Sequence, residues 1–173
     1  MEHAIKALTL TQPWATLVAV GAKEIETRSW PTAYRGTIAI HAGKGLAGGT
    51  EDDLVALCET EPFASALRPH ISGYTAEERA ADLPRGGIVA VVELVSVYRT
   101  AKLEESLRGD GWNVASVLND DELAFGDFTP GRFAWMLRRR VNLHGPIPCR
   151  GRQGLWDVPD DVLARLAYFA DVE

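Results

Sequence analysis

The sequence predicts an α+β domain in which a small, partly open β-barrel is surrounded by helices. Apolar strand-like runs are separated by short helical segments, but they lack the regular strand–helix–strand alternation of a Rossmann-like sheet. The chain has 173 residues, 46% of them hydrophobic, which is enough to bury one core without disulfide bonds. Because it contains no internal repeat and no low-complexity linker, we expect a single domain spanning residues 1–173.

The N-terminal part of the chain predicts a strand, a helix and two further strands. Residues 4–10 and 37–42 are short apolar runs, and residues 24–30 look extended. Apolar residues recur at helical spacing after Pro13, a residue favoured in the first turn of a helix. Gly21 is placed to end this helix, because glycine adopts the left-handed conformation without steric penalty.

The middle of the chain predicts two short helices and the strongest strand. Residues 50–53 and 75–78 each begin with threonine and resemble capping boxes, which open helices. Around them, residues 59–85 form an insertion of irregular or helical character. Residues 87–98 are rich in valine and isoleucine and predict a central strand.

The C-terminal part predicts one more strand between helical segments. Residues 103–108 suit one or two helical turns, whereas residues 110–129 show little periodicity and predict a loop. Large apolar residues occupy alternate positions in 132–141, which predicts a strand with one buried face. Residues 159–170 are amphipathic and predict a terminal helix with acidic residues near its start.

Composition excludes several classes of protein. No stretch approaches about 18 consecutive apolar residues, so we expect no membrane-spanning helix, and the N-terminus lacks the pattern of a secretion signal. Cys58 and Cys149 are solitary, which is typical of a reducing, cytoplasmic compartment. The four histidines lack metal-ligand spacing, so we expect neither a metal site nor a cofactor.

Charge is distributed unevenly around a formal net charge of −6. Residues 50–125 hold fifteen acidic and six basic residues, whereas residues 129–156 hold no carboxylate at all. This asymmetry predicts one basic face on an acidic body, although the same arginines could instead pair with the acidic middle of the chain. The candidate nucleic-acid face consists of the six arginines of the carboxylate-free segment: Arg132, Arg138, Arg139, Arg140, Arg150 and Arg152.

The most distinctive motif is the charged octet at residues 21–28. The pattern Gly-x-Lys-x-x-Glu-x-Arg, with Gln-Pro-Trp-Ala at 12–15, Tyr-Arg-Gly at 34–36 and Gly-Pro-Ile-Pro at 145–148, resembles the ASCH domain of the PUA-like superfamily. The resemblance covers about residues 5–158. It implies a small PUA-like β-barrel of five to six mostly antiparallel strands with peripheral helices. It also implies RNA or a nucleotide as partner, with DNA as an alternative.

The resemblance further implies that Lys23, Glu26 and Arg28 converge in a cleft between the barrel and the first helix. We expect the Lys23 ammonium to be free for a phosphate or carbonyl oxygen. The alternative is a purely structural ion-pair network. The candidate ligand-binding residues are the charged and aromatic side chains near this octet: Lys23, Glu26, Arg28, Trp30, Tyr34, Arg35 and Lys44.

A hydrolase acting on RNA or on a modified nucleoside is a second function class. A family branch that hydrolyses acetylcytidine uses a lysine, a threonine three positions later and a glutamate from a later strand. Lys23 and Glu93 match two of these residues, and Lys23, Glu26 and Glu93 are the catalytic candidates if the protein is an enzyme. Glu26 occupies the place of the threonine, and Thr27 is expected to face the other way, which argues against amidohydrolase activity.

Aromatic residues offer stacking surfaces for bases. From their spacing, Trp14 and Trp135 are predicted to lie in the core, whereas Trp30, next to a proline at a strand end, is the best exposed candidate. The loop at residues 150–154, Arg-Gly-Arg-Gln-Gly, could hold a phosphate, but it matches no established phosphate-binding fingerprint.

Overall fold

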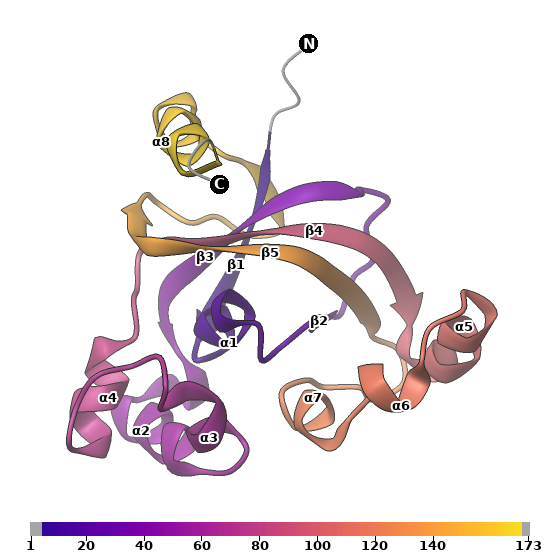
Figure 1. Ribbon diagram of the computed structural model, residues 1–173, viewed down its shortest axis with the longest axis horizontal. Coiled ribbons are helices and arrows are strands. Elements are labelled where there is room, and N and C mark those ends of the chain that lie inside the picture. The colour runs from indigo at the N-terminus through magenta and orange to yellow at the C-terminus, as the bar shows by residue number, and fades with distance from the viewer. Residues whose placement is uncertain (1–4, 171–173) are drawn as a thin grey trace.

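The computed structural model describes residues 5–170 and is built on one six-stranded sheet (Figure 1). The strand order is β2-β5-β4-β3-β1-β6, so β2 and β6 form the two edges of an open sheet. Ala4, where the first predicted strand begins, lies outside the described residues. The strands are β1 (Lys6–Gln12), β2 (Ile25–Arg28), β3 (Gly36–Leu46), β4 (Gly87–Arg99), β5 (Phe133–Pro148) and β6 (Leu155–Asp157).

Most of the strand pairs are antiparallel, as expected for an α+β fold. Among the strands of residues 5–170, only the neighbouring pair β1 and β3 runs parallel, with Leu8 opposite Ile40. The long strands β3, β4 and β5 curve strongly across the molecule (Figure 1). The predicted α+β class and the mostly antiparallel, incompletely closed sheet are therefore confirmed.

The helices cover the sheet in separate groups (Figure 1). Helix α1 packs on one face of the sheet, α8 lies on the other side, and two three-helix groups extend from the ends of β3 and β4. No helix in the described range 5–170 is both long and apolar enough to cross a membrane. The helices are α1 (Trp14–Val20), α2 (Glu51–Glu59), α3 (Phe63–Leu67), α4 (Ala76–Asp82), α5 (Leu103–Gly109), α6 (Val114–Val117), α7 (Asp120–Ala124) and α8 (Asp160–Ala170), with 3-10 turns η1 (Ala47–Gly49) and η2 (Thr100–Lys102).

Local sequence signals set several of these boundaries. Gly21 ends α1 in the left-handed conformation, with φ of 84°, and its N–H donates to the Val18 carbonyl. Thr50 accepts a hydrogen bond from the Asp53 N–H, and Thr75 forms a complete capping box with Glu78. The predicted helix starts and stop are therefore confirmed.

The segment 110–129 is not a simple loop. It contains α6 and α7, whose first turns are capped by the side chains of Asn113 and Asn119. These helices have only four and five residues, so they are too short to show helical periodicity in the sequence. The loop prediction is wrong here, and the correction matters because α7 lies against β2.

Strand β5 is buried on both faces rather than one. Trp135 and Leu137 pack in the core beneath α1, as their alternation predicted. Ala134 and Met136, on the other face, pack with Ile25 and with residues of α5. The helices α5 to α7 therefore cover a face of the sheet that the sequence pattern left open, and they bring α7 to the edge strand β2.

Candidate functional site

The edge strand β2 is held on its outer side by charged side chains. Its backbone pairs with β5 on the inner side, where the Leu137 N–H donates to the Glu24 carbonyl. On the outer side, the Glu122 carboxylate accepts from the N–H groups of Glu24 and Ile25 at 2.8 and 2.9 Å. The Lys23 ammonium donates to the Ile25 carbonyl, and Arg132 Nη2 donates to the Thr27 carbonyl at 3.1 Å. We call these three side chains the β2 caps: Lys23, Glu122 and Arg132.

Lys23 is almost completely buried, with 2% of its surface exposed. Its Nζ lies 3.8 Å from Glu26 Oε2 and 4.0 Å from Glu122 Oε1, in addition to its bond to the Ile25 carbonyl. Burial lowers the pKa of Lys23, while the two carboxylates act in the opposite direction. With one donor bonded to the backbone and two carboxylates within 4.0 Å, the buried ammonium is not freely accessible to a ligand, contrary to the expectation.

Glu122 is a central residue that sequence reasoning missed. It is 3% exposed, and burial raises its pKa, although Lys23 and the two backbone N–H groups favour the charged form. Its position follows from the start of α7, where Asn119 accepts from the Glu122 N–H at 2.9 Å. The pattern Asn-x-x-Glu at 119–122 is the signal that could have revealed this helix start.

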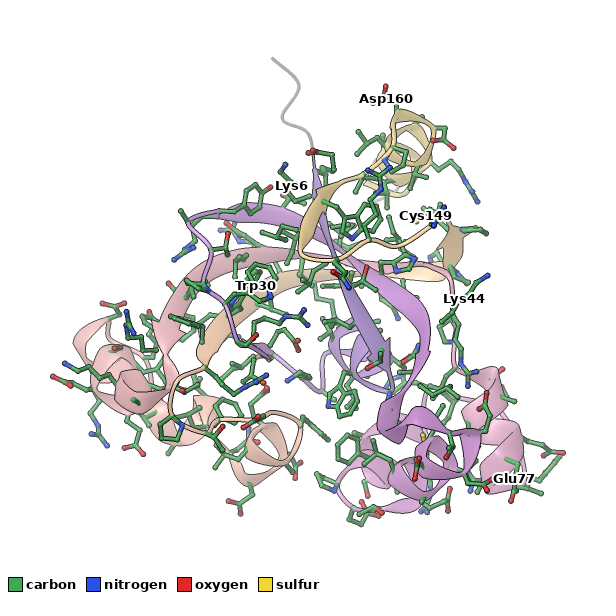
Figure 2. All side chains as sticks on the ribbon, turned by 180° about the vertical axis from the view of Figure 1, so that it is seen from behind. Lys6, Trp30, Lys44, Glu77, Cys149 and Asp160 are labelled. Atoms are coloured by element: carbon green, nitrogen blue, oxygen red, sulfur yellow. The ribbon has the colours of Figure 1, made fainter. Side chains whose placement is uncertain are left out.

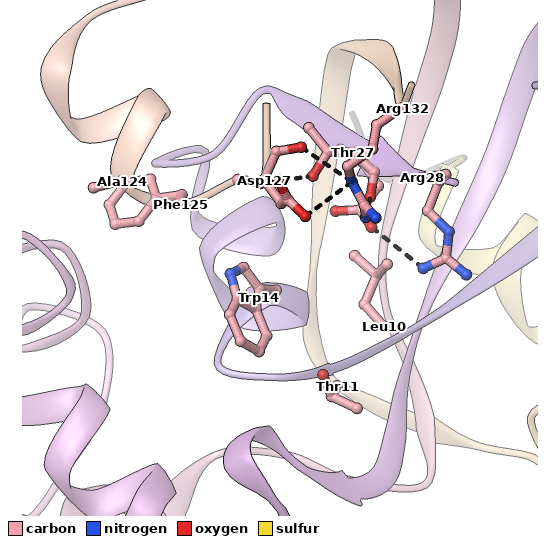
Figure 3. A pocket seen from close by; sticks show the side chains of 11 residues that line it. Leu10, Thr11, Trp14, Thr27, Arg28, Ala124, Phe125, Asp127 and Arg132 are labelled. Atoms are coloured by element: carbon pink, nitrogen blue, oxygen red, sulfur yellow. Dashed lines mark hydrogen bonds and ion pairs between the residues drawn. The ribbon is translucent and has the colours of Figure 1, made fainter. Parts of the chain in front are cut away.

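A cavity of about 320 Å³ opens at the outer edge of β2 (Figure 3). We call it the β2 cavity. Glu26, Thr27 and Arg28 line it from the strand, Trp14 from the start of α1, and Asp127 from the loop after α7. Thr27 was expected to face away from Glu26. Both line the cavity because no further strand covers this edge of the sheet.

Opposite charges lie side by side in the β2 cavity. Glu26 is 7% exposed, and Arg28 Nη1 donates to its Oε1 at 3.4 Å. The Arg28 guanidinium also lies over the Trp30 ring, 5.5 Å from its centroid, and its side chain is 27% exposed. The Arg28–Glu26 contact and the Lys23–Glu26 distance together confirm that Lys23, Glu26 and Arg28 lie within side-chain reach of one another.

A second ion pair, between Arg132 and Asp127, lies beside Thr27 in the same cavity (Figure 3). Arg132 Nε lies 3.3 Å from Asp127 Oδ2 and also donates to the Asp127 carbonyl. The Asp127 N–H in turn donates to the Thr27 hydroxyl at 3.0 Å. These contacts fix the loop after α7 to β2, so that Arg132 acts mainly as one of the β2 caps.

Trp14 and Trp30 are placed differently from what the sequence predicted. Trp135 is fully buried as expected, but Trp14 is only partly buried and lines the β2 cavity. Trp30 is half-buried, because its ring packs edge-to-face on Trp135 at 4.7 Å. Trp14 is therefore the tryptophan that lines the cavity, together with Phe125.

Besides Lys23 and Trp30, three more of the predicted ligand-binding residues do not line the β2 cavity: Tyr34, Arg35 and Lys44. The Tyr34 hydroxyl donates to the Thr37 carbonyl, and Arg35 donates to carbonyls of its own turn. Lys44 is exposed on β3, far from Trp30 (Figure 2). Tyr34 and Arg35 therefore make their contacts in the β2–β3 connection, and Lys44 lies on the surface of β3.

Glu93, a catalytic candidate from the sequence, does not join Lys23 and Glu26. It pairs with Arg139 at 3.2 Å, and a third of its side chain is exposed. Its neighbour Val92 points into the core beneath α1, so the alternation of β4 directs Glu93 to the opposite face of the sheet. The structure thus separates Glu93 from Lys23 and Glu26.

The arginines of the carboxylate-free segment do not share one face. Arg132 lies at the β2 cavity, and Arg150 and Arg152 are exposed in the loop before β6. The other three, which we call the arginine run, line a second cavity of about 270 Å³ beside the buried Lys23. The arginine run consists of Arg138, Arg139 and Arg140.

The arginine run makes surface contacts rather than standing free. Arg138 pairs with Glu24 at 2.8 Å and lies over the Trp112 ring at 4.6 Å. Arg140 donates to the Ala19 carbonyl at 2.7 Å. With the Arg139–Glu93 pair, two of the three arginines have carboxylate partners, as the alternative interpretation of the charge pattern predicted in part.

Chemically, the β2 cavity combines a shielded carboxylate, an accessible guanidinium and an indole ring. Such a set can accept hydrogen bonds, bind an anion and stack on a planar ring. Among residues 5–170, no three His, Cys, Asp or Glu side chains are grouped so as to hold a metal ion.

Comparison with known proteins gives one family match. The family model for the ASCH domain matches residues 8–126. The crystal structure of ASCH from Zymomonas mobilis is similar at 13% identity and a TM-score of 0.49, covering 95% of this chain and 94% of that chain. Two of its single-residue mutants give 14% and 13% identity, TM-scores of 0.49 and 0.48, and coverage of 96% of this chain with 98% and 96% of theirs. No curated protein matches this chain.

Proposed function

The chain belongs to the ASCH domain family, and on that premise we propose that it binds single-stranded RNA or a nucleotide in the β2 cavity. The observation that carries this proposal is the grouping of Glu26, Arg28 and Trp14 around one opening of about 320 Å³. A nucleotide presents a planar base, polar base edges and an anionic phosphate, which are the partners that these three side chains suit.

Arg28 is the residue best suited to a phosphate. Its guanidinium has five donors, of which the 3.4 Å contact to Glu26 uses one, and its side chain reaches solvent. The indole of Trp14 borders the same opening and offers a stacking surface. From there, the arginine run beside Lys23 supplies further phosphate contacts for a longer strand.

The test is the binding of a fluorescently labelled single-stranded RNA at low salt, measured by anisotropy. Arg28→Ala should weaken binding at least about tenfold, because charge-assisted hydrogen bonds contribute about 1.5–3 kcal/mol. The matched control is Arg108→Ala, which removes an exposed arginine that pairs with Glu104 on α5. This control should bind as the wild type does. Absence of binding at low salt, or equal weakening by both substitutions, would reject the proposal.

A hydrolase acting on RNA or on a modified nucleoside is the second candidate. The observation that favours it is that Glu26 and Thr27 line the same cavity, next to Arg28. In this case Glu26 activates a water molecule, and Arg28 stabilises the negative charge that develops.

Turnover assays separate the two candidates. Labelled RNA and acetylcytidine should give product with the wild type and none with Glu26→Gln, while Glu93→Gln retains activity. No product from the wild type on either substrate leaves the binding function alone. Competition between RNA and duplex DNA of equal length then decides which nucleic acid is preferred.

A further inference from the structure

We propose that the β2 cavity selects guanine, because Glu26 and Arg28 together match the Watson–Crick edge of that base. This inference rests on the proposed binding of RNA or a nucleotide and adds a base preference to it. It starts from the hydrogen-bonding capacity that the fold leaves unused at Glu26.

The Glu26 carboxylate has acceptor capacity to spare. A carboxylate can accept about four hydrogen bonds. Glu26 Oε1 receives one long bond from Arg28 at 3.4 Å, and Oε2 lies 3.8 Å from Lys23 Nζ, beyond hydrogen-bond distance. The side chain is nearly buried yet lines the cavity, so few water molecules can reach it. A ligand with two adjacent donors would satisfy both oxygens.

The order of groups along the site is donor, acceptor, acceptor. Arg28 supplies the donor next to Glu26 Oε1, and Oε2 of the same carboxylate, 3.8 Å from Lys23 Nζ, is the second acceptor. The Watson–Crick edge of guanine presents the complementary order: the O6 acceptor, the N1–H donor and the N2 amino donor. Single-stranded bases expose this edge, so a protein can bind it directly.

The other bases do not satisfy both carboxylate oxygens. Adenine places its N1 acceptor, and uracil its carbonyl oxygens, against a negatively charged group. Cytosine donates one amino group to a single oxygen and leaves the second without a partner. Because an unpaired buried acceptor is unfavourable, these bases should bind more weakly.

The rest of the cavity is consistent with a planar base. Trp14 and Leu10 also line the cavity (Figure 3), and they provide apolar surfaces against which a planar ring can pack. Asp127 and Arg132 form an ion pair with each other, and each donates a hydrogen bond to Thr27. They are therefore not expected to compete for the base edge.

The test uses pentanucleotides of RNA that are uridine except at the central position, which is guanine, inosine, adenine, cytosine or uracil. Inosine differs from guanosine only by loss of the 2-amino group. We expect the guanine oligomer to bind at least about tenfold more tightly than the inosine oligomer, because a charge-assisted bond is lost. We expect adenine, cytosine and uracil to be weaker still.

Equal binding of the guanine and inosine oligomers, or preference for another base, overturns the guanine inference but leaves RNA binding intact. Failure of all five to bind overturns both. This series uses only the wild-type chain, so it does not depend on the folding of any variant.

A variant assigns the preference to Glu26. Glu26→Gln replaces one acceptor by a donor, so the ratio of guanine to adenine affinity should fall at least about tenfold. Glu93→Gln, on the other face of the sheet, should leave this ratio unchanged. Melting temperatures of both variants establish that they are folded, and an unchanged ratio in folded Glu26→Gln overturns the assignment.

Discussion

The ion cluster of Lys23, Glu26 and Glu122 at β2 and the arginine run on β5 hold their charges in opposite environments. At β2, the side chains of Lys23 and Glu122 are 1% and 4% exposed, and both also bond to backbone groups. In the arginine run, the Arg139 side chain is 84% exposed and its only contact with a carboxylate among residues 5–170 is Glu93. Buried charges cannot exchange partners with water or ligand at low free-energy cost, whereas exposed pairs can.

This difference in exposure predicts that the buried ions at β2 contribute mainly to stability, whereas the exposed arginines contribute little to it and stay available for the proposed binding. The sequence motif places Lys23, Glu26 and Arg28 together, but only Glu26 and Arg28 line the β2 cavity. Lys23 neutralises the buried carboxylates of Glu26 and Glu122 from behind. Lys23 is therefore expected to affect the stability of the fold more than ligand binding.

Lys23→Ala is the strongest test of this division. It leaves two carboxylates and the Ile25 carbonyl without their cation, so we expect the free energy of unfolding to fall by about 3–5 kcal/mol. Urea denaturation measures the change. The control Arg139→Ala, which breaks an exposed pair, should change it by less than about 1 kcal/mol. Similar small changes in both variants would show that the β2 cluster is no more structural than the arginine run.

The pH dependence of stability provides a second test of the buried cluster, through Glu122. Burial raises the pKa of Glu122 above its ordinary 4.5, so folding favours the protonated form. The stability that this carboxyl contributes is complete below about pH 4.5 and is lost as pH rises through the pKa of the folded state. Glu122→Gln cannot titrate. The wild-type unfolding free energy minus that of Glu122→Gln should therefore decrease on going from acid to neutral pH.

Urea unfolding at several pH values measures this difference. The outcome that contradicts the interpretation is a difference that grows as pH rises, because it would mean that the folded state holds Glu122 in the charged form more strongly than the unfolded state does.

The smallest effect on stability is expected from the arginine run. Replacing Arg138, Arg139 and Arg140 together by alanine should reduce the slope of log affinity for RNA against log salt by up to about 2, because each phosphate contact on a single strand contributes about 0.7. The unfolding free energy should change little, since surface ion pairs are weak. An unchanged slope would remove the arginine run from the binding surface, and the β2 cavity would then carry the binding alone.

Much of the fold could be predicted because its signals are local. Gly21 ends a helix through its own conformational freedom, and Thr75 begins one through its own side chain. The central strand β4 is recognisable from its continuous apolar composition. The proximity of Lys23 and Glu26 likewise follows from a short stretch of chain.

The rest depended on contacts between distant segments. Glu122 lies nearly one hundred positions from the backbone groups of Glu24 and Ile25 that it binds, and no periodicity links them. The access of Thr27 to the cavity follows from the edge position of β2, which is a property of the whole sheet. Trp14 looked like a core residue because its spacing is helical, but it stands at the first position of α1, where the cavity opens.

The β2 caps have a consequence for how the folded chain behaves among its copies. A sheet edge with free N–H and C=O groups is a template on which another chain can add a strand and begin to aggregate. At β2 the outward groups of Ile25 and the Thr27 carbonyl are already bound by Glu122, Lys23 and Arg132. At the other edge, β6 has only three residues and offers little length for pairing. The same charged side chains that bind these backbone groups of β2 therefore also make this edge a poor template for an additional strand.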